Sequence, residues 1–404
     1  MGNAKWEMKM AASALKIKGS QLTQFPISNF PFPIHPNKSL FISNHIKTRQ
    51  EGTSPMMTIE EMVVKARKDG ASDIHLIYNL PPKYRKDGQV VDMSNERLTA
   101  DDCRIIAKVL SGTPQFYEEY VRTGELDAAA TFAGNRCRIH IFRQQGMPSV
   151  ALRLLSDRIP KLETLGLPSA AMKLPDLHKG IVLVTGETGS GKSTSLAALL
   201  DYINHTRCAH IVTLEDPVEY IYTPDKCAIN QREVGKDTMS FASGLRASLR
   251  EDPNVILIGE MRDRETIETA ITAAETGHLV FGTLHTGSAS DAVDRIVQVF
   301  PEGMQTQIRL QLSMVLQAVM TQQLIPKKAG GRALAVEMMV MTDAIRNLIR
   351  NGNTPQIANA IATSAAIGGQ TMDQALVRLV RGGQITKEMA LRYSHDADYV
   401  KKNS

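Results

Sequence analysis

The sequence predicts an α/β protein, with a small α+β domain, a core built on a parallel sheet, and a helical C-terminal region. Three observations lead to this prediction. From about residue 176, apolar runs typical of strands alternate with helical segments, as they do around parallel sheets. The run IVLVT at 181–185 leads directly into the glycine-rich stretch GETGSGKST at 186–194. Residues 58–155 instead alternate apolar and polar residues around turn signals, as antiparallel strands do.

Composition and charge fit an ordinary globular protein of two or three domains. The chain has 404 residues, of which 43% are hydrophobic and 22% charged, and its net charge of +5 suits an anionic partner without selecting one. The most apolar window, residues 310–325, contains Gln and Thr and predicts an amphipathic helix, so no transmembrane segment is expected. The four cysteines form no C-x-x-C pair, which favours reduced thiols and a cytoplasmic protein.

Five segments are expected along the chain. Residues 1–55 predict a poorly ordered extension, because QFPISNFPFPIHPN has no helical or strand period; a targeting peptide and a wrongly assigned start codon both stay open. The other segments are a domain at 56–156, a linker at 157–175, the core at 176–300 and a helical region at 301–404. The domain at 56–156 should contain helices at 58–70 and 99–111, and strands at 73–77, at 82–93 around an Asp87-Gly88 turn, and across 125–155.

GETGSGKST matches the pattern G-x-x-x-x-G-K-[ST] and predicts a phosphate-binding loop for a nucleotide. Its glycines let backbone N–H groups turn toward an anion at a helix N-terminus, Lys192 reaches the β and γ phosphates, and Ser193 binds Mg²⁺. A strand before the loop and a helix after it argue against a chance match. The nucleotide-binding residues expected here are Gly186, Thr188, Gly189, Ser190, Gly191, Lys192, Ser193 and Thr194.

An acidic residue follows the apolar run of NVILIGEMRD, which ends at Gly259-Glu260. Phosphate-loop enzymes usually place one acid at the end of such a strand to hold Mg²⁺ and a second acid to orient the attacking water. Gly259 occupies the first of these places. Glu260 is therefore the candidate catalytic base, and the alternative is an ordinary acid at a strand end.

Three more acids, Glu215, Asp216 and Glu219, follow the strand expected at 211–214. Carboxylates this close repel each other unless a cation or a basic partner lies among them. The group predicts either a Mg²⁺ site beside the phosphate loop or a solvated acidic turn.

Two histidines and two arginines complete the set of candidates. His278 and His285 lie before and after one expected strand, where we expect them to sense the γ-phosphate or to hydrogen-bond Glu260; a structural role is the alternative. Arg138 and Arg153 are placed on two neighbouring strands of the small domain. From the residues alone, we expect arginines on the exposed face of a strand to be solvated and to have no further role.

These motifs, in this order and spacing, resemble the secretion and pilus ATPases of the RecA-like additional-strand type. GETGSGKST, LEDPVEY, GEMRD and TAAETGHLVFGTLHT look like that family's Walker A motif, Asp box, Walker B motif and His box. ASDIHL at 71–76 resembles the start of its PAS-like N-terminal domain. AIRNLIR at 344–350, followed by MDQALVRLVRGGQIT, resembles the PilT-type retraction ATPases of type IV pili in particular. The resemblance runs from about Met57 to Tyr393.

The resemblance implies a hexameric, cytoplasmic ATPase motor that uses ATP and Mg²⁺ to retract a pilus and acts on a platform protein of the inner membrane. In it, Glu260 is the catalytic glutamate. The implied roles of the others are arginine fingers for Arg138 and Arg153, acids around Mg²⁺ for Glu215, Asp216 and Glu219, and sensors for His278 and His285. The AIRNLI helix is implied to serve retraction and not hydrolysis as such.

Three other readings compete with this one. An assembly or type II secretion ATPase usually carries a larger N-terminal region and a four-cysteine metal loop, and this chain has neither; a relative for DNA import or protein secretion stays open. A RecA-type nucleic-acid motor suits the net charge, but only 5% of residues are aromatic and no stretch interleaves basic and aromatic residues. We therefore expect no sequence-specific nucleic-acid binding. A nucleotide-gated scaffold without turnover would lack a catalytic acid, and Glu260 is present.

Overall fold

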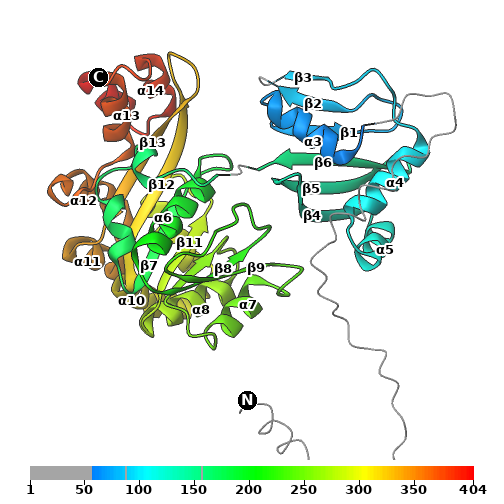
Figure 1. The fold of residues 1–404 in the computed structure, drawn as a ribbon. Coiled ribbons are helices and arrows are strands. Elements are labelled where there is room, and N and C mark those ends of the chain that lie inside the picture. Colours follow the sequence, from blue (N-terminus) through cyan, green and yellow to red (C-terminus); the bar gives the residue numbers. More distant parts are fainter. Residues whose placement is uncertain (1–56, 87–88, 156–157) are drawn as a thin grey trace, which may run out of the picture. The chain divides into compact units, whose positions relative to one another are not determined.

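The computed structural model describes residues 57–86, 89–155 and 158–404. The extension expected at 1–55 and the turn expected at Asp87-Gly88 lie outside these residues. The described residues form two sheets, one of six strands and one of seven. Figure 1 labels the strands and helices of both. The α/β fold class predicted from the sequence is confirmed.

The six-stranded sheet is entirely antiparallel, in the order β3-β2-β1-β6-β5-β4. Its elements are α3 Ile59–Lys68, β1 Asp73–Leu76, β2 Lys83–Lys86, β3 Gln89–Asp92, α4 Ala100–Leu110, α5 Pro114–Thr123, β4 Glu125–Phe132, β5 Asn135–Gln144 and β6 Met147–Leu154. Helix α5 was missed from the sequence, although its signals are local: Thr113 caps its start, Pro114 takes the first position, and Gly124 ends it with φ of 89°.

One face of this sheet is apolar and the other is charged. Ile74, Leu152 and Ile139 lie opposite one another on β1, β6 and β5, and all three are buried. Helices α3 and α4 contact the strands with their buried faces. Because side chains alternate along a strand, the neighbouring residues Asp73 and Arg153 point to the opposite, polar face.

The seven-stranded sheet has the order β13-β12-β7-β11-β10-β8-β9 and is parallel except for β13. Its strands are β7 Gly180–Thr185, β8 His210–Glu215, β9 Ala228–Glu233, β10 Val255–Ile258, β11 Leu279–Leu284, β12 Leu316–Pro326 and β13 Arg332–Val340. The α-helices of this part are α6 Lys192–Thr206, α7 Phe241–Ser248, α8 Arg264–Glu275, α9 Ala289–Gln298, α10 Glu302–Val315, α11 Asp343–Asn351, α12 Ile357–Ala362, α13 Met372–Arg381, α14 Lys387–Tyr393 and α15 Ala397–Asn403. Short 3₁₀ turns are η1 Leu162–Thr164, η2 Ala171–Asp176, η3 Thr354–Gln356 and η4 Ala365–Ile367.

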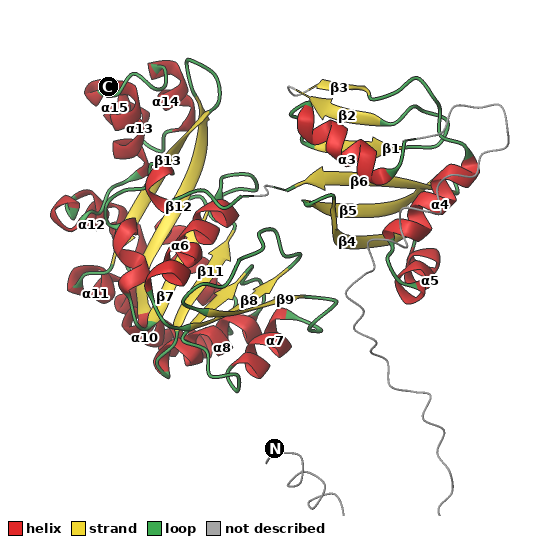
Figure 2. Ribbon diagram, in the orientation of Figure 1, coloured by secondary structure: helices red, strands yellow, loops and turns green. Residues whose placement is uncertain are grey.

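The central strands of this sheet are covered on both faces, as parallel strands usually are. Every residue of β7, β10 and β11 is buried. Ile181 and Leu183 pack in a cluster with α8, α9 and α10, whereas Val182 and Val184 pack on the other face with α6. Figure 2 shows helices on both sides of these strands. The sheet therefore presents only its strand ends to a ligand.

Two expectations about the chain after residue 156 are wrong. The window 310–325 is not one helix, because α10 ends at Val315 and β12 begins at Leu316. A buried strand and a buried helix give similar apolar runs, and here the run belongs to a strand. Since β12 pairs with β7 and β13 pairs with β12, the sheet continues past residue 300 and the region after it is not purely helical. The expected linker at 157–175 contains Leu162 and Ala171, which pack into the core of this sheet.

Candidate functional site

The glycine-rich stretch forms the loop between β7 and α6. Gly186 has φ of +136°, and a Cβ added there would lie 2.4 Å from the backbone oxygen of Gln322 on β12, so only glycine fits. Gly191 precedes α6 with φ of 94° and supplies no side-chain cap. The free N–H groups of the first turn of α6 are thus available to an anion.

Lys192 lies at the centre of this loop. Its Nζ donates to the carbonyl oxygens of Gly186 at 2.7 Å and Glu187 at 3.0 Å, and the residue is only 9% exposed. Burial lowers the pKa of Lys192, and the nearby carboxylates of Glu260 and Glu219 oppose that shift. Both candidate acids therefore lie within electrostatic reach of the loop lysine.

The other loop residues divide by exposure. Thr188, Gly189 and Ser193 are exposed, whereas Ser190 is buried. Within the described residues, the Ser190 hydroxyl has no hydrogen-bond partner. Thr194 Oγ1 lies 2.9 Å from the hydroxyl of Tyr220, which ties the first turn of α6 to the acidic loop after β8.

Glu215 ends β8 at the same edge of the sheet. Its Oε1 accepts hydrogen bonds from Thr213 Oγ1 at 2.6 Å and Gln231 Nε2 at 3.3 Å. Burial nevertheless raises the pKa of Glu215 to about 7. Asp216 is exposed and Glu219 is half-buried. The described residues contain no cluster of three or more His, Cys, Asp or Glu side chains arranged as a metal site, so these acids do not form a closed cage.

Glu260 follows β10, and its position depends on the close packing of the preceding residue, Gly259. Gly259 lies against the end of β8: its N–H donates to Leu214 O at 2.8 Å, and an added Cβ would lie 3.0 Å from the same oxygen. The carboxylate of Glu260 accepts from Arg262 Nε and lies 3.5 Å from His285 Nε2. Burial alone would raise the pKa of Glu260, but Arg262 and His285 hold it below its ordinary value. Glu260 is therefore ionised at neutral pH.

The two histidines lie at opposite edges of the sheet, and the prediction that both flank the phosphates is wrong for His278. Strand β11 runs parallel to β7, with Leu279 opposite Gly180 and Leu284 opposite Thr185. His285 follows β11 and reaches Glu260, whereas His278 precedes the strand, about 23 Å away by the rise of seven residues. The ring Nδ1 of His278 lies 2.8 Å from Ala273 O, at the end of α8.

Arg138 and Arg153 belong to the antiparallel sheet and lie directly opposite each other on β5 and β6. Arg138 is half-buried, and Arg153 Nε donates to Asp73 Oδ1 at 2.9 Å. The two arginines therefore share one row of the polar face of that sheet.

Four residues of interest were not predicted from the sequence: Arg262, Tyr220, Gln322 and Asp73. Arg262 and Asp73 stand inside motifs that were recognised, GEMRD and ASDIHL, so their charge was a usable signal. Gln322 was hidden in the window expected to be a helix. Its Nε2 donates to Ser195 Oγ at 2.7 Å, and the adjacent Thr321 hydroxyl lies 2.8 Å from that of Thr185. Strand β12 thus packs directly against the phosphate loop and the residues on either side of it.

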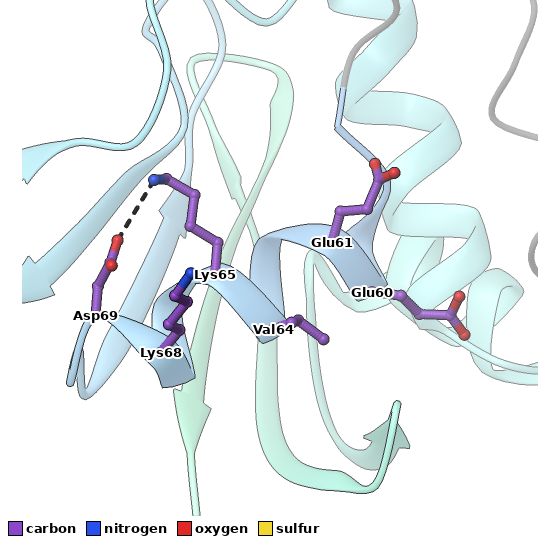
Figure 3. Close-up of a pocket in the computed structure, with 6 residues that line it drawn as sticks. All are labelled: Glu60, Glu61, Val64, Lys65, Lys68 and Asp69. Carbon is purple, nitrogen blue, oxygen red and sulfur yellow. Dashed lines mark ion pairs between the residues drawn. The ribbon is translucent and has the colours of Figure 1, made fainter.

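A pocket of about 470 Å³ lies elsewhere, along helix α3 (Figure 3). It is lined by Glu60, Glu61, Val64, Lys65, Lys68 and Asp69. Its charges are mixed, and Lys65 Nζ pairs at 3.4 Å with Asp69, the residue that caps the end of α3. None of the candidate site residues lines it.

No helix in the described part of the chain is long and apolar enough to cross a bilayer.

Comparisons with known proteins agree on one family. The family model described as type II/IV secretion system protein matches residues 49–391. A type IV pilus retractation ATPase, PilT of Pseudomonas aeruginosa, is 48% identical over 277 residues, which are 68% of this chain and 79% of that protein. A twitching motility protein of Neisseria gonorrhoeae is 49% identical over 264 residues, 65% of this chain and 71% of the relative. A crystal structure of the pilus retraction motor PilT with bound ADP has a TM-score of 0.80 at 44% identity and covers 86% of this chain and 100% of its own.

Proposed function

The chain belongs to the type II/IV secretion system protein family, and we propose that it is an ATP-hydrolysing motor that retracts a type IV pilus. The observation that carries the proposal is the position of Lys192 in the phosphate loop, where the charges of Glu260 and Glu219 act on it. We assign the pilus as the load because the chain is similar to relatives named as a retraction ATPase and a twitching motility protein.

The phosphate loop holds the nucleotide. Backbone N–H groups of the loop and of the first turn of α6 face the phosphates, and Lys192 exchanges the carbonyls of Gly186 and Glu187 for phosphate oxygens. That exchange is favourable because a partly desolvated ammonium group gains an anionic partner. ADP in the retraction motor of known structure supports the same use of this loop.

Glu260 is the general base that orients and deprotonates the attacking water. Its lowered pKa keeps the carboxylate ionised, and His285 lies 3.5 Å away at the same edge of the sheet. We assign His285 the role of orienting Glu260 and sensing the γ-phosphate. His278 receives no catalytic role, because β11 separates it from this edge.

The residues around the loop fit a Mg²⁺ ion that keeps most of its waters. The exposed Ser193 hydroxyl would hold it directly, and Glu215 and Asp216 would hold it through water, with Glu219 close to Lys192. The ion, when bound, neutralises charge on the phosphates. A carboxyl whose pKa is about 7, such as Glu215, also suits a site that gains a cation with the nucleotide.

Arg138 and Arg153 supply the remaining positive charge at the γ-phosphate. They are the arginine fingers of a homohexamer whose sites are completed by small domains, within one subunit and from its neighbour. The ring acts in the cytoplasm, at the base of the pilus, on a platform protein of the inner membrane. Since an arginine finger contributes about 10³ to 10⁵ in rate, an isolated subunit should be nearly inactive.

Glu260→Gln tests the assignment of the base. We expect ATP turnover to fall by at least about 10² while ATP binding is retained, because the amide keeps the shape of the side chain and loses its basicity. Glu265→Gln on the exposed start of α8 is the matched control and should keep normal turnover. Undiminished turnover in Glu260→Gln would remove Glu260 from the mechanism.

A further inference from the structure

We propose that Asp73 is the positioning residue that aims Arg153 for ATP hydrolysis. The inference rests on the proposed role of Arg153 and adds to it a residue that holds the arginine in place. It is carried by the register of the antiparallel sheet and by the contacts of one carboxylate.

Four charged residues form a row across four adjacent strands. On β2, β1, β6 and β5 the residues directly opposite one another are Arg85, Asp73, Arg153 and Arg138. Directly opposed residues in an antiparallel sheet project from the same face. Asp73 is the only acid in this row, and it lies between two of the three arginines.

The carboxylate of Asp73 divides its two oxygens between its neighbours. Oδ1 accepts from Arg153 Nε at 2.9 Å, and Oδ2 accepts from Ser72 Oγ at 2.7 Å and lies 3.9 Å from Arg85 Nε. The Asp73 side chain is 14% exposed. Burial would raise its pKa, yet the bonds from Ser72 and Arg153 hold the pKa below its ordinary value. The acid is therefore charged and held by more than one bond.

Without Asp73 the row would contain only positive charges, which repel one another. Like charges directly opposite on neighbouring strands repel, so Arg138 pushes the guanidinium of Arg153 away from the position that an anion shared by both would require. The charge of Asp73 offsets this repulsion from the other side of β6.

The bond at Nε also determines which donors of Arg153 remain for a ligand. A guanidinium has its N–H donors in a fixed plane, so a carboxylate at Nε fixes that plane and leaves the terminal N–H groups on its other edges available to a second anion. The Arg153 side chain is 64% exposed, so these terminal nitrogens can reach a phosphate. Pre-orientation of this kind lowers the cost of ordering the side chain during the reaction.

Asp73→Asn in the full-length chain tests the inference. We expect kcat for ATP to fall about ten- to a hundredfold, with ATP affinity unchanged, because arginine fingers act on charge that develops during transfer. Asp127→Asn is the matched control: Asp127 is 60% exposed on the same sheet and pairs with His140 at 3.1 Å, away from Arg153. This control should keep normal turnover. Asp73→Glu keeps the charge and should retain more activity than Asp73→Asn.

A double-mutant cycle separates positioning from a general loss of structure. In an Arg153→Ala background, Asp73→Asn should cause no further loss of kcat. In an Arg138→Ala background, Asp73→Asn should still lower kcat. Normal kcat in Asp73→Asn, or a full additional loss on top of Arg153→Ala, would overturn the inference while leaving the motor proposal intact. Normal turnover in Arg153→Ala would instead overturn the proposed role of Arg153, and the inference with it.

Discussion

Gly186 allows the phosphate loop to approach the backbone of β12 closely. We expect Gly186→Ala to lower the free energy of unfolding by about 1–3 kcal/mol and to impair ATP binding, because the new Cβ would meet the Gln322 oxygen at 2.4 Å. Gly189→Ala is the matched control. Gly189 also has a positive φ, +82°, but open space around it, so its cost should be only about 1 kcal/mol. Thermal unfolding of both variants checks this, and equal losses would contradict it.

Glu337 is a buried acid that joins two helix starts. It is 4% exposed on β13; its Oε1 accepts from Ala289 N at 2.7 Å and its Oε2 from Met372 N at 3.3 Å, at the first residues of α9 and α13. Burial raises the pKa of Glu337 above its ordinary 4.5, although these two bonds act against the shift. The stability that this raised pKa contributes is present below pH 4.5 and is lost as the pH rises through the folded-state pKa.

Glu337→Gln should remove that pH dependence. The variant should be less stable by about 1–3 kcal/mol at acidic pH, because the amide offers one acceptor to two N–H groups. Its deficit should then shrink as the pH rises, since only the wild type has to ionise a buried carboxyl. Urea unfolding from pH 4 to pH 8 measures this difference. A deficit that stays constant or grows with pH would contradict the assignment.

At the scale of elements, Arg346 on α11 links this helix to the end of α10, in addition to the apolar packing between the two helices. Arg346 Nη1 donates to the carbonyl oxygens of Ser313, Met314 and Leu316, which the end of α10 leaves without helical partners. This arginine belongs to the AIRNLIR stretch. The motif therefore has a structural task in addition to any surface that it offers to a partner.

Arg346→Ala should lower stability by about 1–3 kcal/mol, because charge-assisted bonds to those carbonyls are lost. Arg350→Ala, on the same helix, loses only a long bond of 3.4 Å to Arg346 O and should be nearly neutral. Per assembled ring, both variants should keep ATP turnover within about twofold, since neither residue lies at the phosphate loop. A stable Arg346→Ala chain with abolished turnover would contradict the assignment of a structural role, and no role in hydrolysis, to Arg346.

The elements that were predicted correctly have local signals, although α5, whose signals are also local, was missed. The strand, glycine loop and helix around Lys192 and the strand before Glu215 follow from composition and spacing within a few residues. Strand β12 was missed because its partner β7 lies more than a hundred residues earlier in the chain, and an apolar run does not reveal which partner buries it. His278 was misplaced for a related reason. Residues before and after a strand are near in sequence, but the strand carries them to opposite edges of the sheet.

At the scale of the whole molecule, the site that we propose draws on two sheets. In this proposal the parallel sheet provides the phosphate loop, Glu260 as the base and the acids after β8, and the antiparallel sheet provides the row of arginines. A hydrolysis site that needs both sheets allows the state of the nucleotide to control how domains are held together. Such a device turns a chemical step into movement, which is what a retraction motor requires.

The measurement that tests this account most directly is ATP turnover as a function of protein concentration, with the mass of the assembly determined in parallel. It is made for the wild type and for Arg138→Ala. We expect turnover only where hexamers are present, and we expect turnover to fall by about 10³ or more in the variant while ATP still binds. Full turnover by a monomer, unaffected by Arg138→Ala, would contradict a ring motor with shared sites.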